Sequence, residues 1–172
     1  DVPFNLHIID DCSSDPQVPK YLYDVAARYP NVNVYSNEVN QGFTKTVNKL
    51  LKLCTNDIIV LLNSDIEVPT GWLSRLIAPM LLDQKIGTIP PISNCATICS
   101  FPNMGDNPLL AHYNVETINY PLLEMGLYYE EIPTGVGFCM VISNPMLQKI
   151  GLLNEEVFPR GYGEENDLCF RA

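Results

Sequence analysis

Strand-like and helix-like patterns alternate three times in the first half of this 172-residue chain, and this alternation constrains the fold most. The apolar runs 4–9, 32–34 and 58–62 have the length of short strands. Each is followed by a segment whose apolar residues recur every three or four positions, as on one helix face. The pattern predicts an α/β, Rossmann-like fold, in which helices flank a mostly parallel sheet with right-handed crossovers.

Helix signals set the expected boundaries. Asp15-Pro16 begins one helix and Pro30 ends it. The next runs from Phe43 to Cys54, with an apolar face of Val47, Leu50, Leu51 and Cys54. Thr70 is the expected cap of a third.

The second half is less regular. Residues 86–133 are rich in proline and weakly periodic, which predicts one strand and long loops. The apolar run 137–142 predicts another strand, followed by a short helix that Gly151 ends. The last segment, GYGEENDLCFRA, is typical of a glycine-rich turn that enters a helix.

Length and charge narrow the functional classes. The chain has one-domain length and a net charge of −10, which argues against a nucleic-acid partner. The same charge would repel a phosphorylated ligand unless carboxylates held a divalent cation. No apolar run approaches the roughly 18 residues of a membrane span. Because the chain starts without Met and strand-like sequence begins at once, we expect a fragment of a single domain, truncated at both ends.

Six cysteines are scattered through the sequence without a CxxC pair, and the chain has two histidines. This pattern argues against a zinc site, whose ligands come in close pairs. We expect reduced, mostly buried cysteines in a cytoplasmic protein, with the inner face of the membrane as an alternative location.

Acidic clusters follow two of the expected strands. Asp10 and Asp11 follow the first strand, and Asn63-Ser64-Asp65 follows the third. In open parallel sheets, ligands bind outside the carboxyl ends of strands, so both clusters are expected at one crevice. Hard cations such as Mg²⁺ bind through carboxylates completed by substrate phosphates. Each cluster alone is equally typical of a turn, which favours Asp.

A third acidic cluster, Gly163-Glu164-Glu165-Asn166-Asp167, stands at the start of the last expected helix. Carboxylates there could simply complement the helix dipole. Like charges this close also raise at least one pKa, which suits a general base. Asp167 and Arg171 are four residues apart, which predicts an ion pair on the helix surface.

Five segments in this order resemble family-2 glycosyltransferases of the GT-A fold: HIIDDCSSD, NQGFTKTVN, VLLNSDIEV, GVGFCMVIS and GYGEENDLCFR. The resemblance covers Phe4 to Arg171. It implies one catalytic domain over residues 1–172, with a nucleotide-binding half at about 1–85 and an acceptor half at about 86–172. Residues 94–131 carry no readable pattern, and we expect them to shape acceptor choice.

The resemblance implies roles on the donor side. Asp11, or its neighbour Asp10, is expected to contact the nucleotide base. Asn40 and Gly42 would lie in a loop close to the nucleotide. The sequence Asn63-Ser64-Asp65 is similar to the family's DxD motif, so the diphosphate would be bridged to Asp65 by Mg²⁺ or Mn²⁺.

The resemblance also implies roles on the acceptor side. Glu165 is similar in place to the family's catalytic base, with Glu164 as the alternative. A segment containing Thr134, Gly135 and Gly137 would line the acceptor.

The implied reaction transfers a hexose or rhamnose from a UDP-, GDP- or dTDP-linked sugar to a hydroxyl of a carbohydrate or lipid-linked acceptor, with inversion. Synthesis of cell-surface polysaccharide or glycoconjugates is the expected setting.

Two other interpretations stay open on sequence grounds. A receiver-type signalling domain also places acidic residues after its first and third strands around Mg²⁺. It needs a Lys after a late strand, whereas Lys149 lies inside a helical pattern, and it leaves GYGEEND without a purpose. A non-catalytic sugar-binding fragment is the second alternative.

Overall fold

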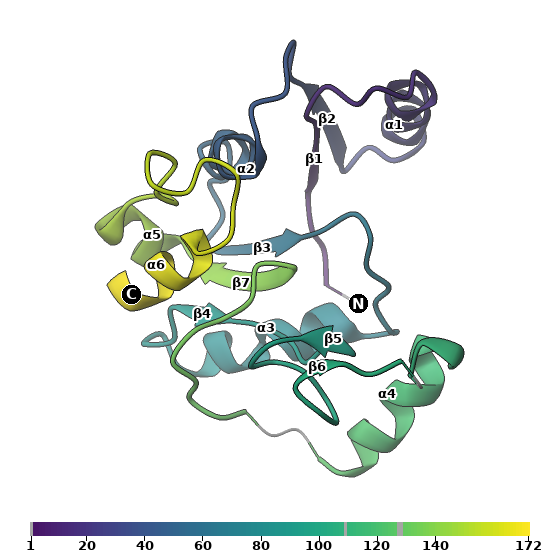
Figure 1. Ribbon diagram of the computed structural model, residues 1–172, viewed down its shortest axis with the longest axis vertical. Helices are drawn as coiled ribbons and strands as arrows, with labels where there is room; N and C mark the ends of the chain where they lie inside the picture. Colours follow the sequence, from purple (N-terminus) through teal and green to yellow (C-terminus); the bar gives the residue numbers. More distant parts are fainter. Residues whose placement is uncertain (1, 109, 127–128) are drawn as a thin grey trace. The chain divides into compact units, whose positions relative to one another are not determined.

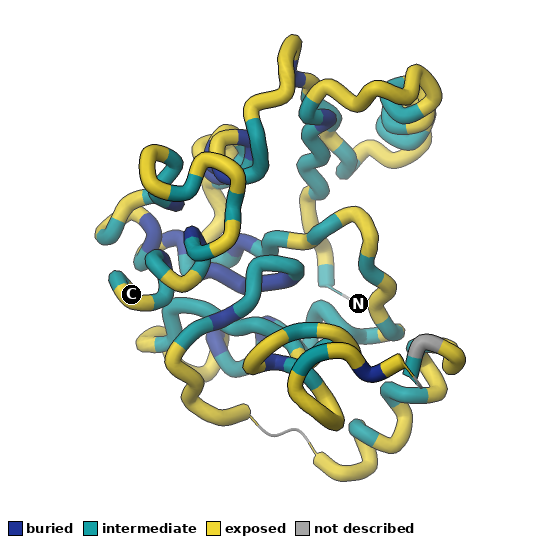
Figure 2. The backbone as a smooth tube through the Cα atoms, viewed as in Figure 1, coloured by how far each residue is buried: buried dark blue, intermediate teal, exposed yellow. Residues whose placement is uncertain are grey.

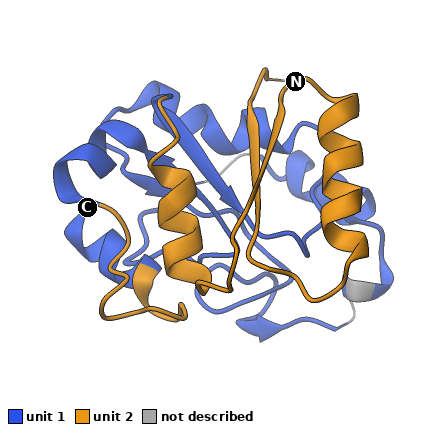
Figure 3. Cartoon of the chain, turned by 90° about the horizontal axis from the view of Figure 1, so that it is seen from above, with its two compact units in different colours: residues 1, 56–151, 165–172 blue, residues 2–55, 152–164 orange. Residues whose placement is uncertain are grey.

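The computed structural model describes residues 2–108, 110–126 and 129–172, and it divides the chain into two compact units. Unit 1 contains residues 56–151 and 165–172, and unit 2 contains residues 2–55 and 152–164 (Figure 3). Each unit therefore combines two segments that are separated along the sequence. The prediction that residues 1–172 form one catalytic domain stays a prediction.

Unit 2 is built on a parallel strand pair joined by a helix. Strands β1 (Leu6–Asp10) and β2 (Val32–Ser36) pair in register from Leu6 opposite Val32 to Asp10 opposite Ser36. The connection between them is α1 (Gln17–Arg28). This β–α–β order is the one that the alternating pattern predicts. Both strands end on the same side, so the residues after Asp10 and Ser36 are neighbours.

Helix α2 (Phe43–Leu51) completes the regular structure of unit 2. The expected apolar face of this helix is wrong in part, because its fully buried positions are mostly polar. Of the expected set, only Leu51 is fully buried. The helix buries Thr44, Thr46 and Asn48 beside it. Because buried polar groups need hydrogen-bond partners, this face predicts specific contacts rather than simple apolar packing.

Unit 1 contains a three-stranded sheet in the order β3, β7, β4 (Figure 1). The strands are β3 (Ile58–Leu62), β4 (Thr88–Ile89) and β7 (Cys139–Ser143). The central strand β7 runs antiparallel to both neighbours. β3 and β4 therefore point the same way on either side of a reversed strand. The expected parallel pairing is thus found between β1 and β2, whereas β7 pairs antiparallel with both β3 and β4.

The core of unit 1 lies along β7. Its residues Cys139 to Ile142 are all at most 1% exposed (Figure 2). Helices α3 (Trp72–Leu82) and α5 (Asn144–Ile150) both contact this strand. Because a strand buried on both faces reads as one continuous apolar run, the sequence indicates this central position.

Helix ends agree with the sequence in one case and differ in another. Gly151 ends α5 in a left-handed conformation with φ +85°. The expected Thr70 cap of α3 is wrong, because Gly71 occupies that position. The Thr70 hydroxyl instead donates to the Glu116 carboxylate at 2.7 Å.

The expectation of one strand and loops over residues 86–133 is also incomplete. This stretch contains β4, the short strands β5 (Cys95–Ala96) and β6 (Gly105–Asp106), a 3-10 turn η1 (Leu110–His112) and helix α4 (Val115–Glu124). The α4 helix begins at Asn114, whose side chain accepts a hydrogen bond from the Glu116 amide at 2.8 Å. Pro121 lies inside it, which obscures the helical pattern in the sequence.

Two expectations concern the whole chain. Across the described ranges, every helix is too short or too polar to cross a membrane. None of the six cysteines, all of them described, forms a disulfide. Only Cys99 and Cys139 are buried, so the expectation of mostly buried cysteines is wrong. Burial raises the pKa of Cys139 to about 12, so this thiol stays protonated.

Candidate active site

The two aspartates after β1 have different surroundings. Asp10 is 8% exposed, and its carboxylate accepts a hydrogen bond from the Ser13 amide at 2.9 Å. Its backbone carbonyl accepts one from the Asn37 amide, also at 2.9 Å. Asp10 therefore shapes the turn after β1. Which of the two aspartates contacts the nucleotide base stays a prediction.

The Asp11 carboxylate holds the loop that follows β2. It accepts hydrogen bonds from the Asn37 side-chain amide and the Gln41 backbone amide, both at 2.8 Å. A third bond comes from the Gly42 amide at 3.0 Å. Burial raises the pKa of Asp11, but the hydrogen bonds, led by that of the Gln41 amide, outweigh it and leave the pKa below its ordinary value. Asp11 is thus a fixed negative charge at neutral pH.

Asn40 and Gly42 lie against Asp11, and their expected position close to a nucleotide stays a prediction. The Asn40 side chain donates to the Asp11 carbonyl at 3.2 Å and accepts from the Gly42 amide at 3.1 Å. Gly42 has a φ of +80°, and a Cβ there would lie 2.8 Å from the Pro159 carbonyl oxygen. A left-handed backbone and a close approach both require glycine at this position. Pro159 belongs to the second segment of unit 2, so this contact joins the two segments.

That second segment, residues 152–164, is bonded along the buried polar face of α2. The Asn48 side chain accepts from the Leu153 amide at 3.1 Å and donates to the Leu153 carbonyl at 2.9 Å. One turn earlier, the Thr44 hydroxyl donates to the Phe158 carbonyl. Sequence reasoning missed both residues because it searched α2 for apolar positions. The signal was the presence of Thr44 and Asn48 at i and i+4 on a helix that is otherwise amphipathic.

Glu164 ends this segment and is 4% exposed. A Cβ at Gly161 would lie 3.6 Å from both Glu164 Oε1 and the Phe43 ring. Phe43 is the first residue of α2, directly after Gly42. Unit 2 therefore brings Glu164 near the loop that Asp11 holds.

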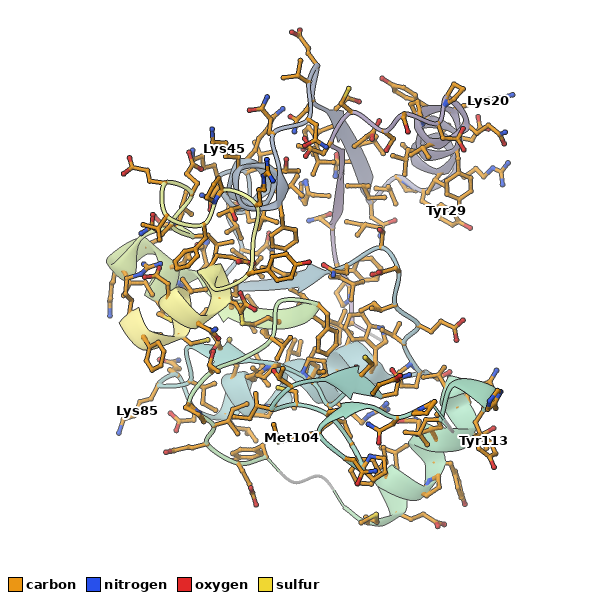
Figure 4. All side chains as sticks on the ribbon, in the orientation of Figure 1. Lys20, Tyr29, Lys45, Lys85, Met104 and Tyr113 are labelled. Carbon is orange, nitrogen blue, oxygen red and sulfur yellow. The ribbon has the colours of Figure 1, made fainter. Side chains whose placement is uncertain are left out.

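A hollow of about 680 Å³ lies beside the same loop in unit 2. Lys45 and Lys49 line it from α2, and Lys52 lines it from the residue directly after that helix. Figure 4 labels Lys45. The Lys49 ammonium donates to the Asn37 side-chain oxygen at 2.7 Å, and Asn37 in turn donates to Asp11. These lysines bring positive charge to a strongly acidic chain. The sequence signal is their spacing of four and three residues, which places them on one helix face.

The DxD-like turn follows β3 in unit 1. The Asn63 amide donates to the Phe138 carbonyl at 2.9 Å, which extends the pairing of β3 with β7. Ser64 and Asp65 are exposed. Within residues 2–108, 110–126 and 129–172, the Asp65 carboxylate accepts no hydrogen bond and forms no ion pair. Its oxygens are therefore open to a ligand.

The donors in this turn fit a cation that a substrate helps to hold. In the described part of the chain, no three His, Cys, Asp or Glu side chains gather closely enough to bind a metal alone. Mg²⁺ commonly binds through one or two carboxylates together with substrate phosphates. Asp65 offers one open carboxylate, and Asn63, two residues before it, carries a side-chain amide oxygen. This pair of side chains matches that kind of shared site.

The acceptor-side segment contacts helix α6 (Glu164–Arg171), whose residues from Glu165 onward belong to unit 1. The Thr134 hydroxyl donates to the Asn166 side-chain oxygen at 2.6 Å. The Gly135 amide donates to Cys169 Sγ at 3.3 Å. Asn166 directly follows Glu165, which is partly exposed. The same segment leads through Gly137 to Phe138, which accepts the Asn63 amide. Unit 1 thus joins the DxD-like turn, the acceptor segment and the Glu165 helix.

The candidate residues therefore form two groups. Unit 2 holds the group of Asp10, Asp11, Asn40, Gly42 and Glu164. Unit 1 holds the group of Asn63, Ser64, Asp65, Thr134, Gly135, Gly137 and Glu165. Hydrogen bonds and close contacts connect the loops and segments that carry each group within its own unit. The convergence of both groups on one crevice stays a prediction.

A family model described as "Glycosyl transferase family 2" matches residues 2–151, which is most of the chain. The chain belongs to this family. The match begins before β1 and ends at the end of α5, so it includes both donor-side motifs and the acceptor segment.

Two curated relatives of this family 2 chain are N-acetylgalactosaminyltransferases. One is "N-acetylgalactosaminyltransferase 7" of Drosophila melanogaster, 26% identical over 125 residues, covering 72% of this chain and 20% of the relative. The other is "Probable N-acetylgalactosaminyltransferase 7" of Caenorhabditis elegans, 23% identical over 185 residues, covering 95% of this chain and 30% of the relative. The chain thus spans less than a third of either relative's length.

Solved structures confirm the GT-A fold of this family 2 chain. A crystal structure of GalNAc-T7 with UDP, GalNAc and Mn²⁺ superposes with a TM-score of 0.70 at 15% identity, covering 97% of this chain and 33% of that one. The mannosyltransferase PcManGT from Pyrobaculum calidifontis, in complex with GDP-Man and Mn²⁺, gives a TM-score of 0.59 at 18% identity, covering 94% and 40%. At these identities the likeness concerns the fold alone.

Proposed function

We propose that this chain is the nucleotide-sugar-binding core of a metal-dependent glycosyltransferase, which moves a sugar from a nucleoside diphosphate to an acceptor hydroxyl. The observation that carries the proposal is the Asp11 carboxylate, which holds Gln41 and Gly42 through their backbone amides. Family 2 membership supports the proposal that this loop faces the nucleotide. The same membership favours a transferase over a receiver domain.

The donor is proposed to be a UDP-linked sugar, with N-acetylgalactosamine as the first sugar to test. The support is the pair of curated relatives and the GalNAc-T7 structure, which holds UDP, GalNAc and Mn²⁺. GDP-linked mannose is the second choice, because PcManGT holds GDP-Man. This choice narrows the hexosyl or rhamnosyl type that the sequence alone suggested.

Asp65 would hold the cation, with Asn63 and Ser64 shaping the turn around it. A bound Mg²⁺ or Mn²⁺ would neutralise charge that develops on the leaving diphosphate. Asp11 would orient the nucleotide base through the loop that it holds. Glu165 would take the proton from the acceptor hydroxyl, with Glu164 as the alternative base. Thr134 and Gly135 would line the acceptor, and the reaction would invert the anomeric centre in a single displacement.

Thermal shift tests the donor side directly. UDP with Mn²⁺ should stabilise the chain, UDP with a chelator should not, and GDP and dTDP should be weaker than UDP. Asp65→Ala should remove the Mn²⁺-dependent part of the shift, because the carboxylate that shares the cation is gone. Glu130→Gln removes an exposed carboxylate elsewhere in unit 1 and is the matched control. Equal Mn²⁺-dependent shifts in Asp65→Ala and wild type would refute the metal assignment.

A non-catalytic sugar-binding fragment is the second candidate. Turnover separates the two. Release of UDP from UDP-GalNAc in the presence of an acceptor supports the enzyme, and NMR of the product's anomeric proton tests inversion. Mn²⁺-dependent UDP binding with no turnover across a panel of peptide, carbohydrate and lipid-linked acceptors would favour the fragment.

The setting of the reaction is also a proposal. Cell-surface polysaccharide or glycoconjugate synthesis and a cytoplasmic location, or one at the inner face of the membrane, follow from the sequence reasoning only.

A further inference from the structure

The contact of residues 152–164 with α2 is unusual because polar side chains make it. Thr44 is 0% exposed and Asn48 is 2% exposed, yet both buried side chains form hydrogen bonds with residues 153–158. Asn48 bonds to both the amide and the carbonyl of Leu153, as a neighbouring strand would. Its amide also donates to the Glu155 carboxylate at 2.8 Å. A side chain whose donors and acceptor are all used is fixed in position and fixes its partners.

The contacts run in order along the two segments. Passing along α2 from Gly42 through Thr44 to Asn48, the partners are Pro159, Phe158 and then Leu153. The second segment therefore runs backward along the helix. Such an ordered set of contacts specifies one register between the two segments. A shift of one residue would leave buried polar groups unpaired, which costs more than the bonds themselves are worth.

The segment ends at the glycine-rich turn of the candidate active site. The Gly161 amide donates to the Phe158 carbonyl at 3.3 Å, and that carbonyl also accepts the Thr44 hydroxyl. A Cβ at Gly163 would lie 2.8 Å from the Phe158 ring. The position of Phe158 therefore determines the path of the backbone from Gly161 to Glu164.

We propose that Thr44 and Asn48 are positioning residues, which hold residues 153–158 on α2 and thereby keep the Gly161–Glu164 turn beside the Asn40–Gly42 loop. This inference rests on the proposed function, because it assigns these two elements to one transferase site. Both side chains bond to the protein itself. They keep the nucleotide-facing loop and the acidic turn at a fixed distance from each other. Because the turn contains Glu164 and leads directly into Glu165, the proposed base then keeps its position relative to the bound nucleotide.

The variant pair Thr44→Val and Thr44→Ser separates positioning from packing. Valine keeps the shape of threonine and loses the hydroxyl donor, whereas serine keeps the donor and loses a methyl group. If the hydroxyl positions the turn, Thr44→Val should lower kcat by roughly 10- to 100-fold, because small displacements of reacting groups are costly. The KM for the nucleotide sugar should change by less than about threefold, since the Asp11 bonds remain. Thr44→Ser should retain kcat within about threefold of wild type.

Asn48→Ala gives an independent test with a matched control. It removes the bonds to Leu153 and Glu155 and should lower kcat in the same way. Asn33→Ala removes an exposed asparagine side chain from β2 of the same unit and should leave kcat unchanged. The concentration of folded protein is set by the stoichiometry of UDP binding, so that a merely smaller folded fraction is not counted as a loss of kcat. Equal kcat in Thr44→Val and Thr44→Ser would overturn the proposal.

Hydrogen exchange keeps the proposal testable without any activity. In Thr44→Val and Asn48→Ala, the amides of residues 161–164 should exchange at least about tenfold faster, while Thr44→Ser and Asn33→Ala should match wild type. If wild type neither binds UDP nor turns over, the proposed function fails, and these exchange rates still decide the positioning role. Unchanged exchange at residues 161–164 in both Thr44→Val and Asn48→Ala would refute it.

Discussion

The two units treat their candidate carboxylates in opposite ways. In unit 2, Asp11 is surrounded by donors from the chain, and its pKa is held below the ordinary value. In unit 1, Asp65 is exposed, and no donor in the described part of the chain bonds to its carboxylate. One carboxylate is therefore used to build the protein, and the other is left for a ligand.

This difference between Asp11 and Asp65 indicates that the two units would contribute to ligand binding in different ways. Groups that the fold itself fixes cost little further entropy when a ligand arrives, which is the advantage of a preorganised site. An exposed carboxylate needs a cation or a phosphate to give it a defined place. Unit 2 would thus supply a rigid surface for the nucleotide, and unit 1 would supply a part of the site that the bound substrate completes.

The largest expected effect is on the chemistry assigned to unit 1. Glu165→Gln removes the proposed base while keeping the shape of the side chain, and kcat should fall by about 10²–10⁴-fold. UDP binding in the presence of Mn²⁺ should stay near the wild-type level, because the donor-side groups are intact. Steady-state kinetics and calorimetry measure the two quantities separately.

Glu164→Gln tests the alternative base in unit 2, and Glu130→Gln is the control for loss of an exposed charge. A loss of kcat in Glu164→Gln together with normal turnover in Glu165→Gln would move the base to unit 2. The comparison between the units would then need revision, because unit 2 would contain both the structural carboxylate of Asp11 and the catalytic carboxylate of Glu164.

The next largest effect concerns the close contact between Gly42 and the Pro159 carbonyl in unit 2. Gly42→Ala would place a Cβ 2.8 Å from the Pro159 carbonyl oxygen. Strain at positive φ and overpacking together should lower the free energy of unfolding by about 2–5 kcal/mol. Chemical denaturation measures this loss.

Gly105→Ala is the matched control in unit 1. Gly105 has a similar φ of +84°, and nothing lies within 4 Å of its Cβ position. Its replacement carries the backbone strain alone, about 1–2 kcal/mol. Equal losses in the two variants would show that the Pro159 contact adds nothing and that unit 2 is less rigid than its bonds indicate.

The sequence predicted helices and strands well where the apolar residues recur with one clear period, that of a helix or that of a strand. The strands β1, β2, β3 and β7 and the helices α1, α2, α3, α5 and α6 lie within a few residues of the expected segments. Their signal is local, because the spacing of apolar residues directly reflects helix or strand geometry. Helix α4 was missed because Pro121 and few buried positions weaken its period.

The direction of β7 and the contacts of α2 could not be read from the sequence. A continuous apolar run such as Cys139–Ser143 shows that a strand is buried, but not which way it runs. Thr44 and Asn48 are polar, and their partners lie over 100 residues away. Such contacts are decided by tertiary structure. The motif residues were predictable one by one, whereas the hydrogen bonds that group them by unit were not.

A smaller effect should follow from the fixed charge of Asp11. Because its pKa in the folded chain lies below the ordinary value of 3.8, the ionised form stabilises unit 2. This contribution is complete above the pKa of the unfolded chain and is lost as pH falls through the lower folded pKa. Asp11→Asn replaces one of the two carboxylate oxygens with a donor that faces a backbone amide, so stability at pH 7 should fall by about 1–3 kcal/mol.

Denaturation of Asp11→Asn and wild type at several pH values measures the expected convergence. The difference between their free energies of unfolding should be constant from pH 5 to 8. It should shrink below about pH 4, where the Asp11 carboxylate of the unfolded wild-type chain becomes protonated, and further as pH falls through the lower pKa of the folded chain. A difference that is independent of pH down to pH 2 would mean that geometry rather than charge holds the loop.

The smallest effect belongs to the surface of unit 1. The Asp167 carboxylate and the Arg171 guanidinium lie 2.7 Å apart on α6, with side chains 26% and 31% exposed. This predicted ion pair should contribute only about 0.3–0.5 kcal/mol, because water and salt screen exposed charges. Asp167→Asn should therefore lower stability slightly at low salt and hardly at all in 1 M NaCl. Arg171 also donates to the Ile150 carbonyl at 2.6 Å, a bond that the substitution leaves in place. A loss as large as that of Asp11→Asn, and insensitive to salt, would show that α6 depends on a fixed charge as unit 2 does, and the contrast between the units would disappear.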